Sequence, residues 1–225
     1  HWTQVKTAIT DPIEYIRNTD APMTLSLDKG NIETAEGTNI STEASRNFLC
    51  HASIGPCCSI AHWGDKKLSV YTHSQAPFPM KRTLSAIFKK PEDDIDVQHY
   101  HGSGCYGHNG ADDVVLDAVL IAKELIGHHV RVVWSREDEL SSSPLAPGMV
   151  TKIDAKIGSK GEINSFDVLV KSPPHVKRPA GKNGEYLLAA EHISSPITPP
   201  NPIDTPLNKG GAADRNSVPL YDIPN

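Results

Sequence analysis

Two stretches of the chain carry apolar residues at helical spacing. In residues 79–89, apolar side chains recur every three or four positions, and Pro91 ends the pattern. In residues 112–126, apolar residues surround most of the helical circumference and leave only a narrow polar stripe, formed by Asp113, Asp117 and Glu124. We therefore predict two helices, the second of them buried on nearly all sides.

Alternation of apolar and polar residues predicts strands around these helices. The last two strands flank a Gly-containing turn at residues 158–161, which is typical of an antiparallel hairpin. Strands that alternate with helices and include such a hairpin favour an α+β two-layer sandwich with a mixed or antiparallel sheet over a doubly wound parallel sheet. The predicted strands are residues 50–63, 67–72, 95–101, 129–135, 148–157 and 162–171.

The strength of this pattern divides the chain into three parts. Residues 1–40 show little periodicity apart from a short helix at 11–18, and we interpret them as a connecting segment. Residues 41–172 hold the predicted domain. Ten of the eighteen prolines lie in residues 173–225, which excludes regular sheet and long helix there. We expect an extended segment, with a short helix only at 185–192.

The composition is that of a mildly acidic chain. A formal charge of −5 and a pI of about 6.1 provide no basic field, so we expect no nucleic-acid partner. No apolar run is long enough to cross a bilayer, and we expect no membrane insertion. The four cysteines form no Cys-x-x-Cys pair, which favours buried thiols over metal ligation.

Three glycines lie between a predicted strand and the apolar helix. Gly102, Gly104 and Gly107 match the spacing of a dinucleotide-binding loop. However, Asp112 and Asp113 would place two carboxylates where a phosphate needs positive potential. The acidic residues after the next strand also come later than the usual spacing of about 20 residues. A nicotinamide-dinucleotide site is therefore the less favoured interpretation.

Four blocks of sequence, at residues 50–56, 72–75, 102–113 and 130–139, carry a resemblance to a known family. Together they resemble the large subunit of molybdenum hydroxylases, the xanthine dehydrogenase and aldehyde oxidoreductase superfamily. Within it, the chain is most similar to the isoquinoline 1-oxidoreductase type, also described as molybdopterin-binding aldehyde dehydrogenase. The blocks follow the family's order, and the resemblance implies a molybdopterin-binding α+β domain.

The resemblance implies a catalytic role for Gln75. It matches the family glutamine whose amide donates a hydrogen bond to an oxo ligand of the molybdenum. An amide suits this task because it donates without titrating. In the alternative interpretation, Gln75 ends a strand and either caps the following helix or faces solvent.

The segment from Gly102 to His108 corresponds to the family's glycine-rich loop, whose backbone lies against the cofactor. The sequence departs from the common form of the loop at Ser103, Cys105, Tyr106 and His108, and the cysteine–tyrosine version argues for the isoquinoline branch over xanthine-like substrates. In the alternative, the glycines only make a tight connection from strand to helix. The resemblance implies cofactor-binding roles for Gly104, Cys105, Tyr106, Gly107 and Gln75.

Several other polar residues have more than one interpretation. His99, His101 and His108 have a spacing that could offer nitrogen ligands to zinc, although hydrogen bonding within the loop is favoured and we predict no metal ligand in the chain. His51 and His73 lie beside the family blocks and are expected to fix loops near the cofactor. The charged run at residues 136–139 indicates a solvated surface or a helix cap.

What the sequence lacks limits the functional prediction. The family's catalytic glutamate lies in a Gly-x-Gly-Glu motif that does not occur here, and the arginine of purine oxidases falls at Leu145. We therefore expect an internal fragment of a larger subunit. By itself it would be inactive and bind no cofactor.

The intact enzyme, by resemblance, hydroxylates an N-heteroaromatic or aldehyde carbon with oxygen from water. Its cofactor would be molybdenum–molybdopterin cytosine dinucleotide. Its partners would be a small-molecule substrate, an iron–sulfur small subunit and, in some members, a cytochrome c, because this chain lacks the cysteine clusters for an iron–sulfur centre. The resemblance is compatible with a bacterial enzyme located in either the periplasm or the cytoplasm. The alternative from another class is a non-catalytic scaffold or interaction module.

Overall fold

The computed structural model describes residues 9–102, 104–107, 109–175 and 183–224. The chain forms two compact units. One, the three-stranded unit, consists of residues 1–49, 147–175 and 203–225, and the other, the four-stranded unit, consists of residues 50–146 and 176–202. The three-part division expected from the periodicity stays a prediction.

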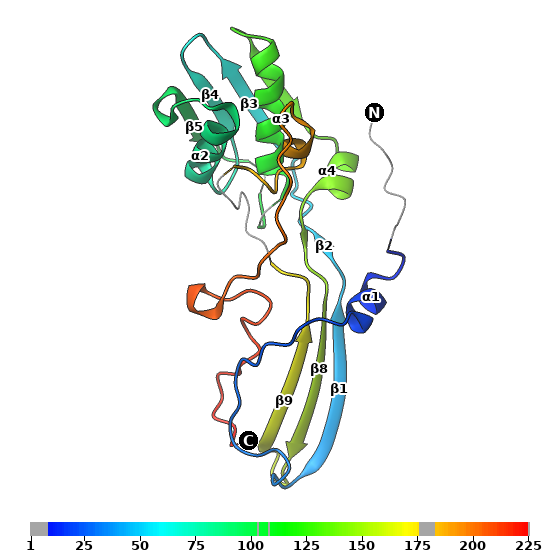
Figure 1. Ribbon diagram of the computed structural model, residues 1–225. Helices are drawn as coiled ribbons and strands as arrows, with labels where there is room; N and C mark the ends of the chain where they lie inside the picture. Colours follow the sequence, from blue (N-terminus) through cyan, green and yellow to red (C-terminus); the bar gives the residue numbers. More distant parts are fainter. Residues whose placement is uncertain (1–8, 103, 108, 176–182, 225) are drawn as a thin grey trace. The chain divides into compact units, whose positions relative to one another are not determined.

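The three-stranded unit is an antiparallel sheet in the order β1-β8-β9 (Figure 1). The strands are β1 (Thr38–Arg46), β8 (Met149–Ile157) and β9 (Ile163–Lys171), and the predicted hairpin joins β8 to β9. Helix α1 (Pro12–Asn18) begins at the N-cap Asp11. Its Arg17 pairs with Glu43 of β1 at 2.9 Å.

Strand β1 was not predicted, since residues up to 40 were interpreted as a connecting segment. All nine of its residues are exposed. A strand with no buried position gives no alternating apolar signal, so only its pairing with β8 along the full register from Thr38–Ile157 to Arg46–Met149 defines it.

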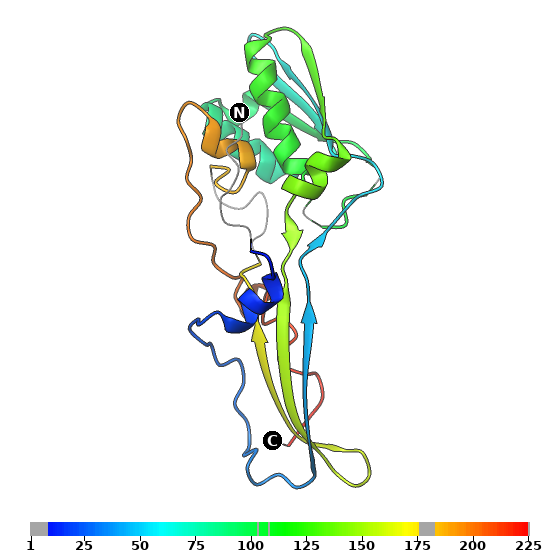
Figure 2. The same cartoon turned by 90° about the vertical axis from the view of Figure 1, so that its right-hand side faces the viewer.

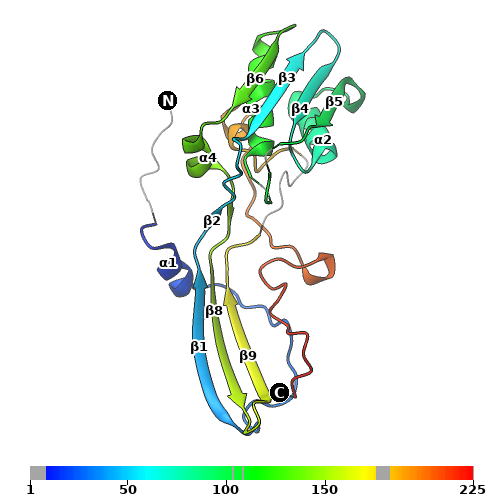
Figure 3. The ribbon, with the colours of Figure 1, turned by 180° about the vertical axis from the view of Figure 1, so that it is seen from behind.

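The four-stranded unit is a two-layer structure. Its sheet has the order β5-β4-β3-β6, with β3 (Cys58–Trp63), β4 (Leu68–Thr72), β5 (Ile95–His99) and β6 (His129–Val133). Helices α2 (Pro77–Phe88) and α3 (Ala111–Glu124) cover one face of this sheet, as Figure 2 shows edge-on and Figure 3 shows from the strand side. The predicted α+β fold with a mixed sheet is confirmed.

Strand pairing in this sheet separates it from a doubly wound fold. Strand β3 is antiparallel to both β4 and β6, whereas β4 and β5 are parallel. Asp112 and Asp113 lie in the first turn of α3, as the sequence predicted. A dinucleotide-binding unit would instead have a parallel sheet and a helix start free for phosphate.

The predicted strand at 50–63 is wrong in its first half. Only the two-residue strand β2 (Leu49–Cys50) and β3 are extended there, and residues 51–57 form a loop, named here the support loop. Ala52 in this loop has φ of +41°, and Pro56 has no N–H to donate to a ladder. These two residues explain why the apolar run does not continue as a strand.

Residues 136–142 form a helix, α4 (Arg136–Ser142), which precedes the short strand β7 (Leu145–Ala146). The helix-cap interpretation of its charged run is confirmed, because Ser135 and Asp138 form a reciprocal capping box. The solvated interpretation is wrong for Glu139, whose side chain is only 3% exposed.

The core lies between α3, α2 and the sheet, and α3 is its most buried element. The polar stripe predicted on α3 is partly buried, because two of its three residues, Asp113 and Asp117, bond groups inside the unit. Asp113 accepts a hydrogen bond from the Leu188 N–H at 3.0 Å, and Asp117 accepts one from Trp134 Nε1 at 2.9 Å. Burial raises the pKa of Asp117. Ile121 is instead 45% exposed, so the helix is less completely buried than predicted.

The proline-rich part supplies core residues. Residues 183–224 contain no strand and no long helix, as predicted. The short helix predicted at 185–192 is the 3₁₀ turn η2 (Leu188–His192), and a second 3₁₀ turn is η3 (Leu207–Lys209). Leu187 and Ala190 are almost fully buried in the core of the four-stranded unit. Residues 183–202 are thus part of that folded unit.

We predict that Leu116→Ala lowers the free energy of unfolding by about 2–5 kcal/mol, because it leaves a cavity beneath the sheet. Ile121→Ala on the same helix is the matched control and should change stability by only about 0.5 kcal/mol. Urea titration followed by far-UV circular dichroism measures both. Equal losses would contradict the assigned core face of α3.

Candidate functional site

The candidate site residues follow two neighbouring parallel strands. Thr72 at the end of β4 pairs in register with His99 at the end of β5, and the Tyr100 N–H donates to the Thr72 carbonyl at 2.7 Å. The chain therefore leaves both strands at the same edge of the sheet. Gln75 follows β4 and the glycines follow β5, so the structure brings these predicted elements to one edge.

Ser74 ties the two segments together. Its fully buried hydroxyl donates to Asp112 of α3 at 2.5 Å and accepts from the Ala76 N–H at 3.0 Å. His99 Nδ1 donates to the Ser74 carbonyl at 2.9 Å. The Asp112 carboxylate is thus engaged in fixing the turn before α2.

Gln75 itself is exposed. The following helix has no side-chain cap at its N-terminus, so Gln75 does not cap it. Within the described part of the chain, no hydrogen bond engages the Gln75 amide. The side chain is thus available to an external acceptor.

The glycine loop, residues 102–107, has a backbone that favours glycine at two positions. Gly104 and Gly107 have φ of +102° and +122°. A Cβ at Gly104 would lie 2.5 Å from the Tyr106 ring, and one at Gly107 would lie 2.6 Å from His51 Nε2. Tyr106 is itself at φ of +55° and its side chain is 59% exposed. The loop therefore presents backbone and an aromatic ring.

Cys105 stabilises this loop from within. Burial raises the pKa of its thiol, so the thiol is protonated near neutral pH and can donate. Its Sγ lies 3.0 Å from the Gly107 carbonyl and 3.2 Å from Asn109 Oδ1. Cys105 is thus a donor within the loop, and Ser103 and His108 lie outside the described residues.

His51 and His73, which the sequence predicted to fix loops near the cofactor, both lie close to glycines of the glycine loop. His51 Nδ1 donates to the Pro144 carbonyl at 3.1 Å, and this leaves Nε2 towards Gly107. His73 Nε2 accepts from the Cys58 N–H at 3.4 Å. The ring of His73 also lies close to Gly102, because a Cβ atom on Gly102 would be only 2.9 Å from His73 Cγ.

The environment of His73 disfavours its charged form. Burial lowers the pKa of His73, with a smaller opposing effect from Glu139. With Nε2 as an acceptor, the proton is on Nδ1, which is buried and has no hydrogen-bond partner among the described residues. His73 is therefore a neutral imidazole with one unused donor.

The zinc alternative rests on His99, His101 and His108. His99 hydrogen-bonds Ser74, which is the loop role that the sequence favoured, and its ring packs edge-on against His101 at 5.8 Å. His108 lies outside the described residues. Among the residues that are described, no three His, Cys, Asp or Glu side chains are arranged to hold a metal ion.

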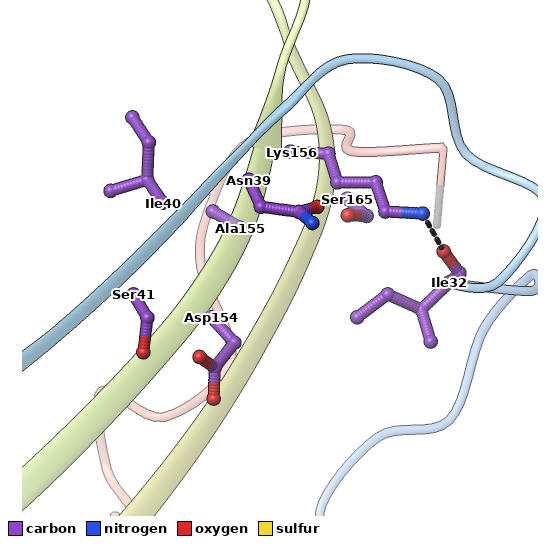
Figure 4. A pocket seen from close by; sticks show the side chains of 8 residues that line it. All are labelled: Ile32, Asn39, Ile40, Ser41, Asp154, Ala155, Lys156 and Ser165. Carbon is purple, nitrogen blue, oxygen red and sulfur yellow. Dashed lines mark hydrogen bonds between the residues drawn. The ribbon is translucent and has the colours of Figure 1, made fainter.

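A separate pocket of about 370 Å³ lies in the three-stranded unit (Figure 4). None of the predicted site residues lines it. Lys156 at its wall donates to the Ile32 carbonyl at 3.0 Å. The lining residues are Ile32, Asn39, Ile40, Ser41, Asp154, Ala155, Lys156 and Ser165.

No described helix combines the length and apolar character that crossing a membrane requires.

Comparison with known proteins gives one family and several relatives. A family described as the molybdopterin cofactor-binding domain matches residues 18–172. One subunit of the nicotinate dehydrogenase of Pseudomonas putida is 28% identical over 218 residues, which is 95% of this chain but 17% of that protein. The chain thus spans about a sixth of the length of this curated relative.

Solved structures of low identity share the fold. Quinoline 2-oxidoreductase from Pseudomonas putida 86 has a TM-score of 0.56 at 17% identity, over 71% of this chain and 22% of that one. CO dehydrogenase from Oligotropha carboxidovorans has a TM-score of 0.52 at 23% identity, over 61% and 17%. Aldehyde oxidoreductase from Desulfovibrio gigas has a TM-score of 0.51 at 12% identity, over 62% and 16%.

We predict that Gly107→Ala lowers the free energy of unfolding by about 1–3 kcal/mol, because both its positive φ and the His51 contact oppose a Cβ. Gly161→Ala is the control, since Gly161 also has positive φ but nothing within 4 Å of a Cβ. Denaturation should show a smaller loss for Gly161→Ala and partial recovery in the Gly107→Ala, His51→Ala double variant. Equal losses at both glycines would contradict the close approach.

The lowered pKa of His73 predicts a pH dependence of stability. Because the unfolded state takes up the proton more readily, the contribution of His73 is complete above pH of about 6.5 and is lost as the pH falls further. His73→Gln should therefore lose less stability than the wild type between pH 7 and 5 in urea titrations. The exposed His128→Gln serves as control, and identical pH profiles for wild type and His73→Gln would refute the assignment.

Proposed function

This chain belongs to the molybdopterin cofactor-binding domain family, and from that premise we propose that it forms part of the cofactor site in the large subunit of a molybdenum-containing oxidoreductase. The observation that carries the proposal is the meeting of Gln75 and the glycine loop at the ends of β4 and β5. Both elements belong to the four-stranded unit.

The residues present fit such a cofactor. A pterin is flat and polar, and the glycine loop, whose turns use the positive φ of Gly104 and Gly107, presents the exposed aromatic ring of Tyr106. The exposed Gln75 amide has no competing partner within the described residues. When bound, the molybdenum cofactor supplies the two-electron oxidation of the substrate, and the protein supplies position and electrostatics.

We assign each residue a role from its contacts. The Gln75 amide donates a hydrogen bond to a ligand atom of the metal. Gly104 and Gly107 let the loop adopt positive φ and pack against Tyr106 and His51, and Cys105 holds the loop through its bonds to Gly107 and Asn109. Tyr106 places its exposed ring beside the cofactor or substrate. The general base comes from elsewhere, because the sequence contains no Gly-x-Gly-Glu motif.

The proposed reaction is hydroxylation of a ring or aldehyde carbon with oxygen from water. The names of nicotinate dehydrogenase and quinoline 2-oxidoreductase support an N-heteroaromatic substrate, and that of aldehyde oxidoreductase supports an aldehyde. The Cys105–Tyr106 pair favours the isoquinoline 1-oxidoreductase type. We propose the cytosine dinucleotide form of the cofactor.

Electrons would leave through a partner. We propose an iron–sulfur small subunit, with a cytochrome c as a further acceptor, because the four cysteines of this chain are free and not clustered.

The proposed reaction can be tested by oxygen labelling. The protein is purified from its native host with its partners, and its molybdenum and pterin contents are measured. It is then assayed with N-heteroaromatic compounds and aldehydes in H₂¹⁸O. We expect molybdenum, pterin and a product that carries ¹⁸O. Label derived from ¹⁸O₂ instead, or a protein without molybdenum, would contradict the proposal.

We predict that Gln75→Ala in the native protein reduces turnover roughly tenfold to a hundredfold, the effect of losing a hydrogen bond of about 1–3 kcal/mol. Folding and molybdenum content should change little, because Gln75 has no partner within the described residues. Gln98→Ala is the matched control, since Gln98 is an exposed glutamine on β5 bonded to Asp96. Wild-type turnover in Gln75→Ala would remove Gln75 from the site.

A further inference from the structure

A buried carboxylate on α4 lies close to the support loop without touching the glycine loop. Glu139 is 2% exposed. Its Oε1 accepts from the Cys57 N–H at 2.6 Å, and its Oε2 pairs with Arg136 Nη1 at 2.6 Å. A charge this buried is costly unless it is paired and hydrogen-bonded, and here both oxygens have partners.

Arg136 extends the same interaction to the support loop. While Nη1 pairs with Glu139, Nη2 donates to the carbonyls of Ser53 at 2.6 Å and Ile54 at 2.9 Å. These carbonyls directly follow Ala52, whose φ of +41° is unfavourable for a residue with a Cβ. The planar guanidinium holds the carboxylate through Nη1 and both carbonyls through Nη2, in a fixed geometry that the single nitrogen of a lysine does not reproduce.

Buried polar contacts lead from the support loop to the glycine loop. Ser53 is 1% exposed, and its Oγ accepts from Asn109 Nδ2 at 3.2 Å. Asn109 is 3% exposed, and its Oδ1 accepts from the Ala111 N–H at 3.0 Å and from Cys105 Sγ at 3.2 Å. Asn109 therefore joins the support loop, the start of α3 and the glycine loop.

We propose that Arg136 and Glu139 are positioning residues that set the conformation of the glycine loop through Ser53 and Asn109. They act at a distance, since their side chains bond the support loop and, among the described residues, make no hydrogen bond to the glycine loop. The consequence for cofactor retention rests on the proposed function, whereas the consequence for loop conformation does not.

This proposal differs from a general stabilising role in where its effect appears. Loss of the pair releases the carbonyls of Ser53 and Ile54, and the support loop can then move away from Asn109. Strands β3 and β4 keep their own ladder. Amide exchange should thus rise at residues 53–57 and 104–109 while it stays unchanged in these strands.

The test compares Glu139→Gln with Glu137→Gln. The Cys57 N–H and Arg136 Nη1 each donate to one oxygen of Glu139. A glutamine at 139 has an oxygen for one of these donors and an NH₂ group facing the other, so one of the two contacts must break. Glu137 is exposed in the same helical turn, and its replacement removes the same charge. Should Glu139→Gln fail to fold, Arg136→Met removes the bonds to Ser53, Ile54 and Glu139 and leaves the Glu139 carboxylate bonded to the Cys57 N–H.

Two readouts are made on the native protein. Hydrogen exchange is expected to accelerate by about tenfold or more at residues 104–109 in Glu139→Gln or Arg136→Met, and not in Glu137→Gln. Molybdenum per protein chain should fall to less than half of the wild-type value in the same variants only. Exchange that rises equally in β3, β4 and the loop would overturn the positioning role in favour of a global one.

The outcomes separate the two proposals. If wild-type protein holds molybdenum and the variants retain it with unchanged loop exchange, the positioning role is wrong and the cofactor site stands. If wild-type protein holds no molybdenum but the variants still loosen the loop selectively, the positioning of the loop stands and the cofactor site falls.

Discussion

The parallel pairing of β4 with β5 is the contact on which the candidate site depends. In an otherwise antiparallel sheet, it makes two consecutive strands end at the same edge, with Thr72 opposite His99. The segment after β4 carries Gln75 and the segment after β5 carries the glycines. An antiparallel pairing would have sent the two segments to opposite edges, and no local feature of either could have brought them together.

Buried polar residues then fix both segments. Ser74 bonds Asp112, and Asn109 bonds Ser53, so the start of α3 is joined to the β4 segment and to the support loop. These contacts lie where water cannot replace a lost partner, and each broken one leaves a group unsatisfied. They therefore allow the glycine loop to adopt positive φ at three positions while Gln75 and Tyr106 remain exposed.

The sequence predicted those elements whose burial leaves a periodic signal. Helix α3 and the β8–β9 hairpin were found because their apolar residues and turn glycines follow helical or strand patterns. Strand β1 was missed because all its residues are exposed. The burial of Leu187 was missed because Leu187 lies in a short irregular stretch and packs against residues far away in the sequence. Residues 51–57 were predicted as strand because an apolar run alone does not show a residue with positive φ.

The site was predictable in part, and through resemblance rather than periodicity. The motifs indicated Gln75 and residues 102–108 as elements of the candidate site, and the parallel pairing of β4 with β5 brings Gln75 and Gly102 to one edge of the sheet. The contacts that hold them, such as Asn109 to Ser53 and Glu139 to Cys57, join residues far apart in sequence that share no pattern. Neither interpretation of the charged run, a solvated surface or a helix cap, predicted the burial of Glu139, because a run of charged residues is usually exposed.

The central claim is that the edge beyond β4 and β5 holds part of a molybdenum cofactor site. Crystals of the native protein measured at the molybdenum absorption edge test it most directly. The account predicts an anomalous peak beside the Gln75 side chain and the backbone of Gly104 to Gly107. A molybdenum peak that contacts neither of them would contradict it.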